Sequence, residues 1–183
     1  MSSKTFDLSL IVPFYNAEKN FQRCLMSIKN QNFKGRFEIL FINDCSKDNS
    51  LNIVKKIKLN NKRIFNLKKN KGPSNARNVG IKKSLGKYIY FLDADDEIKQ
   101  NTLSTLFTAS KKNKFDIIAS DKKWIDNKKN QRANKFIFKR DIKLNETDII
   151  KLMKNRFSDT ISTVGMFGLT GKLIRRSIIK KNN

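Results

Sequence analysis

Through the first hundred residues, segments typical of buried strands alternate with segments typical of amphipathic helices, and the connections between them are short. Leu8–Val12 is a continuous apolar run, as expected for a parallel strand buried on both faces. Such alternation predicts an α/β fold with a mostly parallel sheet and helices on both faces. The predicted strands are Leu8–Val12, Glu38–Ile42, Arg63–Leu67 and Tyr88–Leu92, and the predicted helices begin at Asn16 as cap, at Asp48 or Ser50, and at Ser74.

The second half of the chain has a less regular pattern. We expect a helix from about Thr102 to Lys111 and a strand at Phe115–Ser120. Further expected features are a polar stretch, Lys122–Lys135, that pairs with Phe136–Phe138 as a hairpin, a helix at Asn145–Phe157, a glycine-punctuated segment, Val164–Gly171, and a basic run, Lys172–Lys181.

The formal net charge is +24, from 40 Lys and Arg against 16 Asp and Glu. Such a charge favours polyanions: nucleic acid, anionic lipid headgroups or phosphorylated substrates. The lysines are spread over the whole chain, so a generally Lys-rich solvated surface is an equal alternative. A nucleic-acid-binding module would interleave basic residues with exposed aromatic ones. Here most aromatic residues, such as Phe41, Tyr90 and Phe91, fall at core positions, which disfavours nucleic acid as the partner.

Several features bear on the compartment. Cys24 and Cys45 have no partner at metal-site spacing and are interpreted as free thiols of a reducing compartment. The N-terminus leads into a strand without the apolar core of a signal peptide, and no apolar run approaches the roughly 20 residues of a membrane span. We expect a cytoplasmic location, with peripheral contact at the inner face of an anionic membrane through Lys172, Arg175, Arg176, Lys180 and Lys181.

The sequence contains no histidine, which excludes a Ser-His-Asp or Cys-His site. Any general base must therefore be a carboxylate, or else Lys or Tyr. The chain has no G-x-x-x-x-G-K-S/T motif of a P-loop, and no G-x-G-x-x-G follows the first predicted strand. The second absence disfavours a dinucleotide-binding dehydrogenase.

Unusual polar clusters follow three of the predicted strands: Tyr15–Asn16, Asn43–Asp44 and Asp93–Asp96. Open α/β sheets bind ligands at the carboxyl ends of their strands, so this topology gathers the clusters along one edge. Asp93, Asp95 and Asp96 would repel one another unless a cation lies between them. Mg²⁺ or Mn²⁺ commonly uses one or two protein carboxylates together with substrate phosphates. The alternative is a solvated turn with a helix-capping Asp.

Two further loops have polar patterns of their own. In Asn70–Asn78, Gly72 lets a ligand approach the backbone closely and Arg77 offers a planar cationic fork, as in a phosphate-facing loop at a helix start. For Asp48 and Ser50 we favour a structural interpretation, a turn followed by the cap of the next helix.

Four blocks together resemble glycosyltransferase family 2: Ile-Val-Pro-Phe-Tyr-Asn-Ala-Glu (11–18), Phe-Ile-Asn-Asp-Cys-Ser-Lys-Asp-Asn-Ser (41–50), Asn-Lys-Gly-Pro-Ser-Asn-Ala-Arg-Asn (70–78) and Tyr-Phe-Leu-Asp-Ala-Asp-Asp (90–96). Each block is weak alone, but their order and spacing over about residues 7 to 110 are specific. The resemblance implies the Rossmann-like GT-A fold and an inverting enzyme that uses a nucleotide-diphospho-sugar, usually a UDP-sugar.

The resemblance also implies roles for individual residues. Pro13 and Tyr15 would line the base and Asp44 would bond to it, while Gly72 and Arg77 would lie near the base and diphosphate. Asp93 would lie near the ribose, Asp95 would hold Mn²⁺ or Mg²⁺ with Asp93 as the second candidate ligand, and Asp96 would contact the sugar or support the site. Where the family often has two Asp, this chain has Asn43 and Asp44; because the second is the base-reading position, we expect Asn at position 43 to be tolerated.

In domain terms, the resemblance implies a nucleotide-sugar-binding half at residues 1–97 and the start of an acceptor-side region at 98–183. The acceptor would be a glycan or lipid-linked molecule, as in capsule or lipooligosaccharide synthesis. In the family, a stretch similar to Gly171–Ser177 is followed by a Glu-Asp pair whose Asp is the general base. We therefore expect the base to lie beyond Asn183, in a chain truncated before it. The alternative is a natural short member with a substituted base, for which Asp159 or Asp121 could approach the site. The alternatives are a domain that only binds nucleotide-sugar and a basic nucleic-acid-binding domain.

Overall fold

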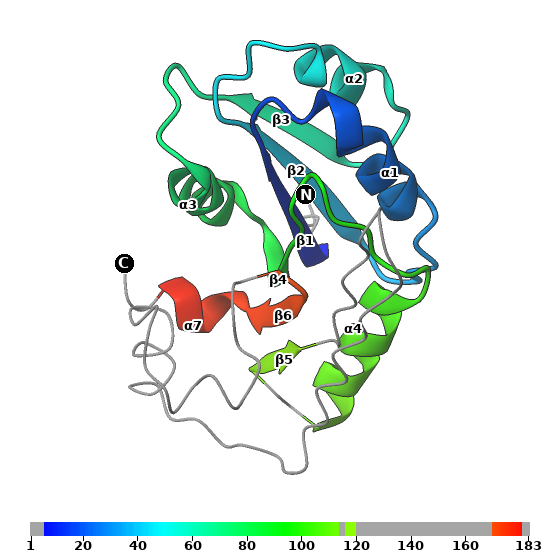
Figure 1. Cartoon of the computed structure of the whole chain (residues 1–183). Helices are drawn as coiled ribbons and strands as arrows, with labels where there is room; N and C mark the ends of the chain where they lie inside the picture. The colour runs from blue at the N-terminus through cyan, green and yellow to red at the C-terminus, as the bar shows by residue number, and fades with distance from the viewer. Residues whose placement is uncertain (1–5, 114–115, 120–169, 181–183) are drawn as a thin grey trace, which may run out of the picture. The chain divides into compact units, whose positions relative to one another are not determined.

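The computed structural model describes residues 6–113, 116–119 and 170–180. The chain divides into two compact units, Met1–Ala119 with Lys172–Asn183, and Ser120–Gly171, and the account below concerns the first. Its elements in chain order are β1 (Phe6–Phe14), α1 (Glu18–Lys29), β2 (Phe37–Asn43), α2 (Ser50–Lys56), β3 (Lys62–Asn66), α3 (Pro73–Lys83), β4 (Gly86–Phe91), α4 (Thr102–Asn113), β5 (Ile117–Ala119), β6 (Lys172–Arg175) and α7 (Arg176–Lys180) (Figure 1).

The strands form one mixed sheet in the order β3-β2-β1-β4-β6-β5. β1 lies between β2 and β4 and pairs in parallel with both, and β2 pairs in parallel with β3. β6 runs antiparallel to β4 and β5, its two neighbours. The predicted α/β class with a mostly parallel sheet is confirmed.

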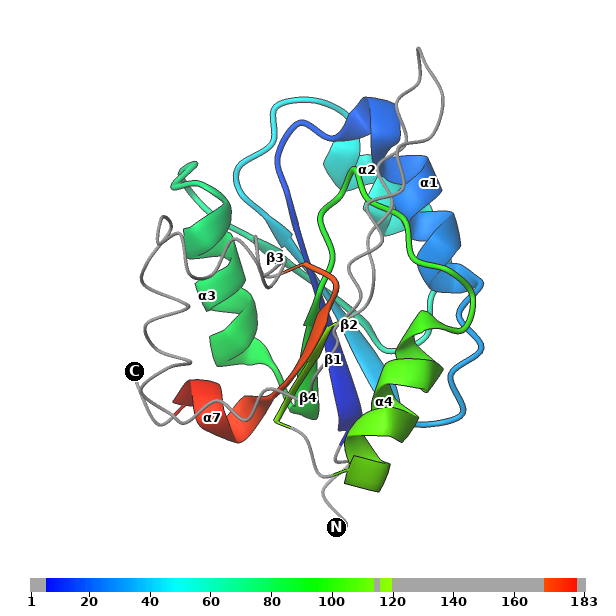
Figure 2. The same cartoon turned by 60° about the horizontal axis from the view of Figure 1, so that its bottom comes forward.

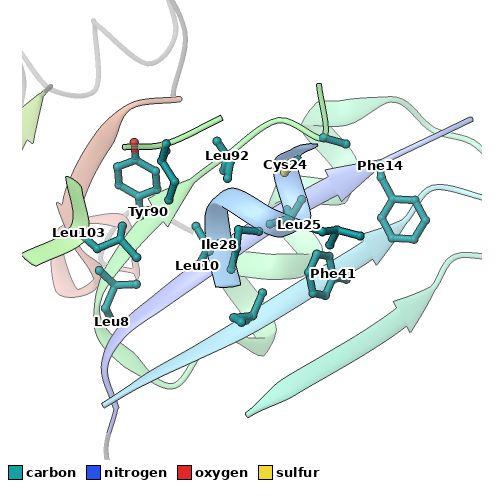
Figure 3. Packing of buried hydrophobic residues seen from close by; sticks show 14 of the residues in the cluster. Leu8, Leu10, Phe14, Cys24, Leu25, Ile28, Phe41, Tyr90, Leu92 and Leu103 are labelled. Carbon is teal, nitrogen blue, oxygen red and sulfur yellow. The ribbon is translucent and has the colours of Figure 1, made fainter. Parts of the chain in front are cut away.

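Helices cover both faces of the sheet, with α1, α2 and α4 on one side and α3 and α7 on the other (Figure 2). Residues of β1 alternate between the faces, so Leu8 and Leu10 join the core under α1 while Ile11 faces α3. The apolar face of α1, formed by Phe21, Cys24, Leu25 and Ile28, packs on this core (Figure 3). These four residues follow the apolar spacing of a helix in the sequence, and in the structure they form the buried face of α1.

α3 lies unusually close to β1 because of a glycine. A Cβ atom placed on Gly80 would lie 2.4 Å from Cγ2 of Ile11, far inside van der Waals contact. Only glycine therefore allows the helix to approach the strand at this point. This close packing fixes the position of α3 against β1. The position of the loop that precedes the helix is thereby fixed as well.

The C-terminal segment corrects one expectation. Lys172–Arg175 is a sheet strand with Lys172 buried, so this part of the basic run is not an open surface. Arg175 pairs with Asp116, and Nη1 of Arg176 donates to the carbonyl oxygen of Ser84 at 2.9 Å. The division expected at residue 97, between a nucleotide-sugar-binding half and an acceptor-side region, stays a prediction. Because β6 pairs with both β4 and β5, the first unit continues to Ala119 and includes the chain from Lys172.

Some expectations fall outside the described residues, namely the hairpin at Lys122–Lys135 and Phe136–Phe138, the helix at Asn145–Phe157, the alternative bases Asp121 and Asp159, residues 164–169, and the side chains of Lys180 and Lys181. Within residues 6–113, 116–119 and 170–180, no helix is both long and apolar enough to cross a membrane.

Candidate functional site

A pocket of about 420 Å³ lies at the carboxyl ends of the parallel strands. Its walls come from the loops that follow β1, β2, β3 and β4, as the sheet topology predicts. The predicted site residues that line it are Pro13, Tyr15, Asp44, Gly72, Arg77, Asp93 and Asp95; Asp96 does not. A larger hollow of about 540 Å³ lies between α1 and residues 97–100, but none of the predicted site residues lines it.

The loop after β1 carries Tyr15, which lines the pocket with 43% of its surface exposed. Asn16, the next residue, has a left-handed backbone with φ of 46°. Asn16 was expected to cap α1, but this expectation is wrong, because Ala17 occupies the cap position without a side-chain hydrogen bond. Instead, Oδ1 of Asn16 accepts from the backbone nitrogen of Lys47 at 2.8 Å, which joins this loop to the loop after β2.

The caps of α1 come from that second loop. The hydroxyl of Ser50 accepts from the backbone nitrogen of Ala17 at 2.8 Å, and Oδ2 of Asp48 accepts from that of Glu18 at 3.0 Å. Partial burial opposes ionisation of Asp48, but hydrogen bonds from Ser50 and Glu18 outweigh it and lower the pKa of this carboxyl. Asp48 and Ser50 are structural, as the sequence indicated, but they cap α1 as well as ordering the turn before α2.

Asp44 lies at the end of β2, and its buried carboxylate holds the loop before α3. Oδ1 accepts from the backbone nitrogen of Lys71 at 3.1 Å and Oδ2 from that of Gly72 at 2.7 Å. Gly72 has φ of 85°, a conformation that costs glycine little and other residues more. The loop conformation at the start of α3 therefore depends on both residues.

Asn43, which stands where the family often has Asp, is buried, and both the nitrogen and the oxygen of its amide are hydrogen-bonded. Nδ2 donates to Oδ1 of Asn66 at 3.2 Å, and Oδ1 accepts from the backbone nitrogen of Ser46 at 2.8 Å. The sequence missed this role because Asn66 lies on β3, and only the sheet pairing places it opposite Asn43.

Arg77 and Asp93 form an ion pair inside the pocket, with Nη2 of Arg77 2.5 Å from Oδ1 of Asp93. Nε of Arg77 is buried and has no hydrogen-bond partner among the described residues. Buried polar groups are normally satisfied, so this N–H is an exception among the described residues. Asp93 already has a cationic partner, which makes it a weaker candidate metal ligand than the sequence indicated.

Asp95 is exposed at the mouth of the pocket, and no hydrogen bond to its carboxylate is found in the part of the chain that the structure describes. The described residues contain no group of three or more Cys, Asp or Glu positioned to hold a metal ion. A divalent ion at Asp95 would therefore need further oxygen ligands, which fits the habit of Mg²⁺ of using few carboxylates together with phosphates. Asp96 is exposed, and its backbone nitrogen donates to the carbonyl oxygen of Asp93 at 3.0 Å.

Cys24 lies behind the acidic loop. Its thiol is buried in the core and lies 3.6 Å from the carbonyl oxygen of Asp93. Burial raises the pKa of the Cys24 thiol strongly, and the negative charges of Asp96 and Asp95 add to the effect. The thiol is therefore a packing group that supports the end of β4.

Known proteins resemble this chain in sequence and in fold. TarP of Staphylococcus aureus, a poly(ribitol-phosphate) β-N-acetylglucosaminyltransferase, is 33% identical over 96% of this chain and 50% of its own length. YibD of Escherichia coli, an uncharacterized glycosyltransferase, is 38% identical over 68% of this chain and 36% of YibD. The structure of S. aureus TarS residues 1–349 with UDP has a TM-score of 0.77 at 29% identity, covering 96% of this chain and 48% of that one.

The same TarS fragment has been solved with UDP-GlcNAc, and there the TM-score is 0.73 at 27% identity over 96% of this chain and 47% of that one. The chain thus spans about half or less of the length of these relatives. The model of glycosyl transferase family 2 matches residues 9–182. Because that match runs from β1 to α7, the chain belongs to glycosyl transferase family 2.

Proposed function

We propose that this chain binds a uridine-diphospho-sugar in the pocket at the carboxyl edge of its sheet and takes part in transferring the sugar, with inversion, to an acceptor hydroxyl. The observation that carries the proposal is the meeting of Tyr15, Asp44, Arg77 and Asp95 in one pocket, from four loops of a family member. The binding of UDP and UDP-GlcNAc by TarS supports the choice of nucleotide.

The base would lie against Tyr15 and Pro13, with an N–H directed at Asp44. Both oxygens of Asp44 already accept a backbone hydrogen bond, but a carboxylate offers about four lone-pair sites. Asp44 therefore has capacity for a further donor. In this arrangement one carboxylate both orders the loop at Gly72 and reads the base.

The diphosphate would lie between Arg77 and the start of α3. Arg77 lines the pocket and supplies the positive charge of its guanidinium, and the helix N-terminus supplies partial positive charge. Arg77 is held in place by Asp93, which in turn would face the ribose. The ion pair thus orients the guanidinium before the ligand arrives.

The metal, Mn²⁺ or Mg²⁺, would be held by Asp95 together with oxygens of the diphosphate. When bound, such an ion stabilises negative charge on the leaving nucleoside diphosphate. We assign the metal to Asp95, because its carboxylate is exposed at the pocket mouth. Asp93 is not assigned to the metal, because it already pairs with Arg77. Asp96 would contact the sugar or support the turn.

Deprotonation of the acceptor needs a carboxylate that is not already engaged. Asp44 is bound to the loop before α3 and Asp93 to Arg77, so we assign the general base to a residue outside this pocket. For the acceptor we propose a surface glycan or lipid-linked polymer. TarP acts on poly(ribitol phosphate), and a chain of net charge +24 suits an acceptor that is itself anionic.

The test is binding of UDP with and without Mn²⁺, measured by calorimetry and by the shift in melting temperature, with a single-stranded oligonucleotide in parallel. We expect stabilisation by UDP that increases with Mn²⁺. Stabilisation by the oligonucleotide but not by UDP would favour the nucleic-acid-binding alternative. Release of UDP from a UDP-sugar and an acceptor then separates an enzyme from a domain that only binds.

A further inference from the structure

The loops after β1 and β2 are joined by a set of hydrogen bonds that none of the roles above uses. The backbone nitrogens of Asn16, Ala17 and Glu18 donate to side chains of the other loop, at distances of 2.8 to 3.1 Å. In return, the backbone nitrogen of Asn49 donates to Oε2 of Glu18 at 3.1 Å. Each loop thus satisfies backbone groups of the other, over a separation of about thirty residues.

Asp48 is at the centre of this set. Oδ2 accepts from the nitrogen of Glu18, while Oδ1 accepts from both the nitrogen and the hydroxyl of Ser50, at 3.0 and 2.6 Å. The hydroxyl of Ser50 in turn accepts from the nitrogen of Ala17. One carboxylate therefore ties the first turn of α1 to the start of α2, and its negative charge faces the positive end of α1.

This connection reaches the wall of the pocket on one side only. Neither Asp48 nor Ser50 lines the pocket, whereas Tyr15 and two of the residues that the connection holds, Asn16 and Ala17, do. The backbone of Asn16 has a left-handed φ, which costs a non-glycine residue conformational energy. The neighbouring hydrogen bonds to Ser46, Lys47 and Ser50 therefore hold Asn16 in a conformation that it would not favour alone.

We propose that Asp48 is a positioning residue for nucleotide binding, which acts by fixing the start of α1 and so the direction in which Tyr15 enters the pocket. The proposal rests on the proposed function, since its ligand is UDP. Asp48 does not touch the nucleotide. Its effect on affinity passes through Tyr15.

A double-mutant cycle tests this transmission, with UDP affinity measured by calorimetry in Mn²⁺. Asp48→Asn keeps the shape but removes the charge, and it is made in the unmodified chain and in a Tyr15→Ala background. We expect Asp48→Asn to weaken UDP binding about tenfold in the unmodified chain. In the Tyr15→Ala background the same change should weaken UDP binding by less than about twofold, because the effects of coupled sites are not additive. A merely structural role of Asp48 would give equal losses of UDP affinity in the unmodified chain and in the Tyr15→Ala background.

The matched control is Asp7→Asn. Asp7 also accepts a backbone hydrogen bond, from Arg36 at 3.0 Å, but at the amino end of β1, away from the pocket. This variant should bind UDP like the unmodified chain. If Asp48→Asn is unfolded by circular dichroism, Ser50→Ala enters the same cycle, since it removes the acceptor for Ala17 and leaves the carboxylate in place.

Two outcomes would overturn the inference, and they are distinguishable. Equal losses in both backgrounds, with UDP binding intact in the unmodified chain, would show that Asp48 does not act through Tyr15. Absence of UDP binding by the unmodified, folded chain would remove the proposed function, and the inference with it.

Discussion

The guanidinium of Arg77, on α3, lies 2.5 Å from the carboxylate of Asp93, which follows β4. The pair is mostly shielded from solvent on the Arg77 side, where 16% of the side chain is exposed, against 34% for Asp93. A cation and an anion that could each attract ligand groups thus partly neutralise one another. The separate carboxylate of Asp95 stays exposed to a ligand, while Nε of Arg77 is buried without a described partner.

Arg77→Gln should weaken UDP binding by the same factor with and without Mn²⁺. The change removes charged donors facing the diphosphate, whose hydrogen bonds contribute about 1.5–3 kcal/mol. It also leaves Asp93 without its cation, so a small drop in melting temperature is expected. Calorimetry in the two buffers provides the measurement. A loss confined to the Mn²⁺ buffer would assign Arg77 to the metal's environment instead.

Asp95→Ala should show the opposite pattern, removing the Mn²⁺-dependent part of UDP affinity while leaving the metal-free part unchanged. Asp95 is exposed and no described group hydrogen-bonds its carboxylate, so the fold does not depend on it. Glu97→Ala is the matched control, because Glu97 is an exposed acid two residues further along that lines the other hollow. Metal-dependent binding that survives in Asp95→Ala would refute the metal assignment.

Asp44→Ala should cost UDP binding about 1–3 kcal/mol, the range for a lost buried hydrogen bond. Asp44→Asn should cost less, because one amide oxygen still accepts from Gly72 or from the base. Asn43→Ala should instead lower stability, since it leaves Asn66 and the nitrogen of Ser46 without partners. Titration of UDP and urea unfolding of the three variants separate the two effects. Equal losses of UDP affinity for Asp44→Ala and Asn43→Ala would contradict the base-reading role.

The sequence predicted the features that depend on neighbours along the chain. The apolar spacing of Phe21, Cys24 and Leu25 identifies the buried face of α1 from α1 alone. The loops at Asp44 and Asp93 were predicted to converge because parallel strands end at one edge. Features that depend on distant pairing were missed. β6 consists of four residues, two of them basic, and only its neighbours β4 and β5 make it a strand.

The caps of α1 were misassigned for the same reason. Asn16 stands directly before the helix and is a residue type that caps helices, so local pattern favours it. In the structure its side chain is bound to Lys47, and the caps come from Ser50 and Asp48, about thirty residues further along. Parallel strands place the loops before α1 and α2 side by side, so a side chain of one loop can cap either helix. The sequence around such a side chain does not indicate which of the two helices it caps.

The two cysteines should differ in reactivity. Cys45 is partly exposed, and its thiol lies 3.7 Å from the carbonyl oxygen of Lys68, whereas Cys24 is fully buried with its pKa raised by that burial. A thiol reagent at pH 8 should therefore modify one thiol per native chain and the second only after unfolding. Cys45→Ser is the control, and its native state should show no fast reaction. Rapid modification of that variant would mean that the core under α1 opens readily.

Lys62 should contribute to stability although it is a lysine on an edge strand. Its ammonium donates to the carbonyl oxygens of Val54, Lys55 and Ile57 at 2.7 to 3.0 Å, and so satisfies the C-terminal end of α2, where helix carbonyls lack partners. Positive charge there also faces the negative end of the helix. Lys62→Met should lower the free energy of unfolding by about 1–3 kcal/mol, the cost of leaving these carbonyl groups unsatisfied.

The control is Lys56→Met, because Lys56 is an exposed lysine of α2. This change should alter the free energy of unfolding by less than about 0.5 kcal/mol. Urea unfolding provides both values, and equal values would show that the three hydrogen bonds of Lys62 add nothing to ordinary surface charge.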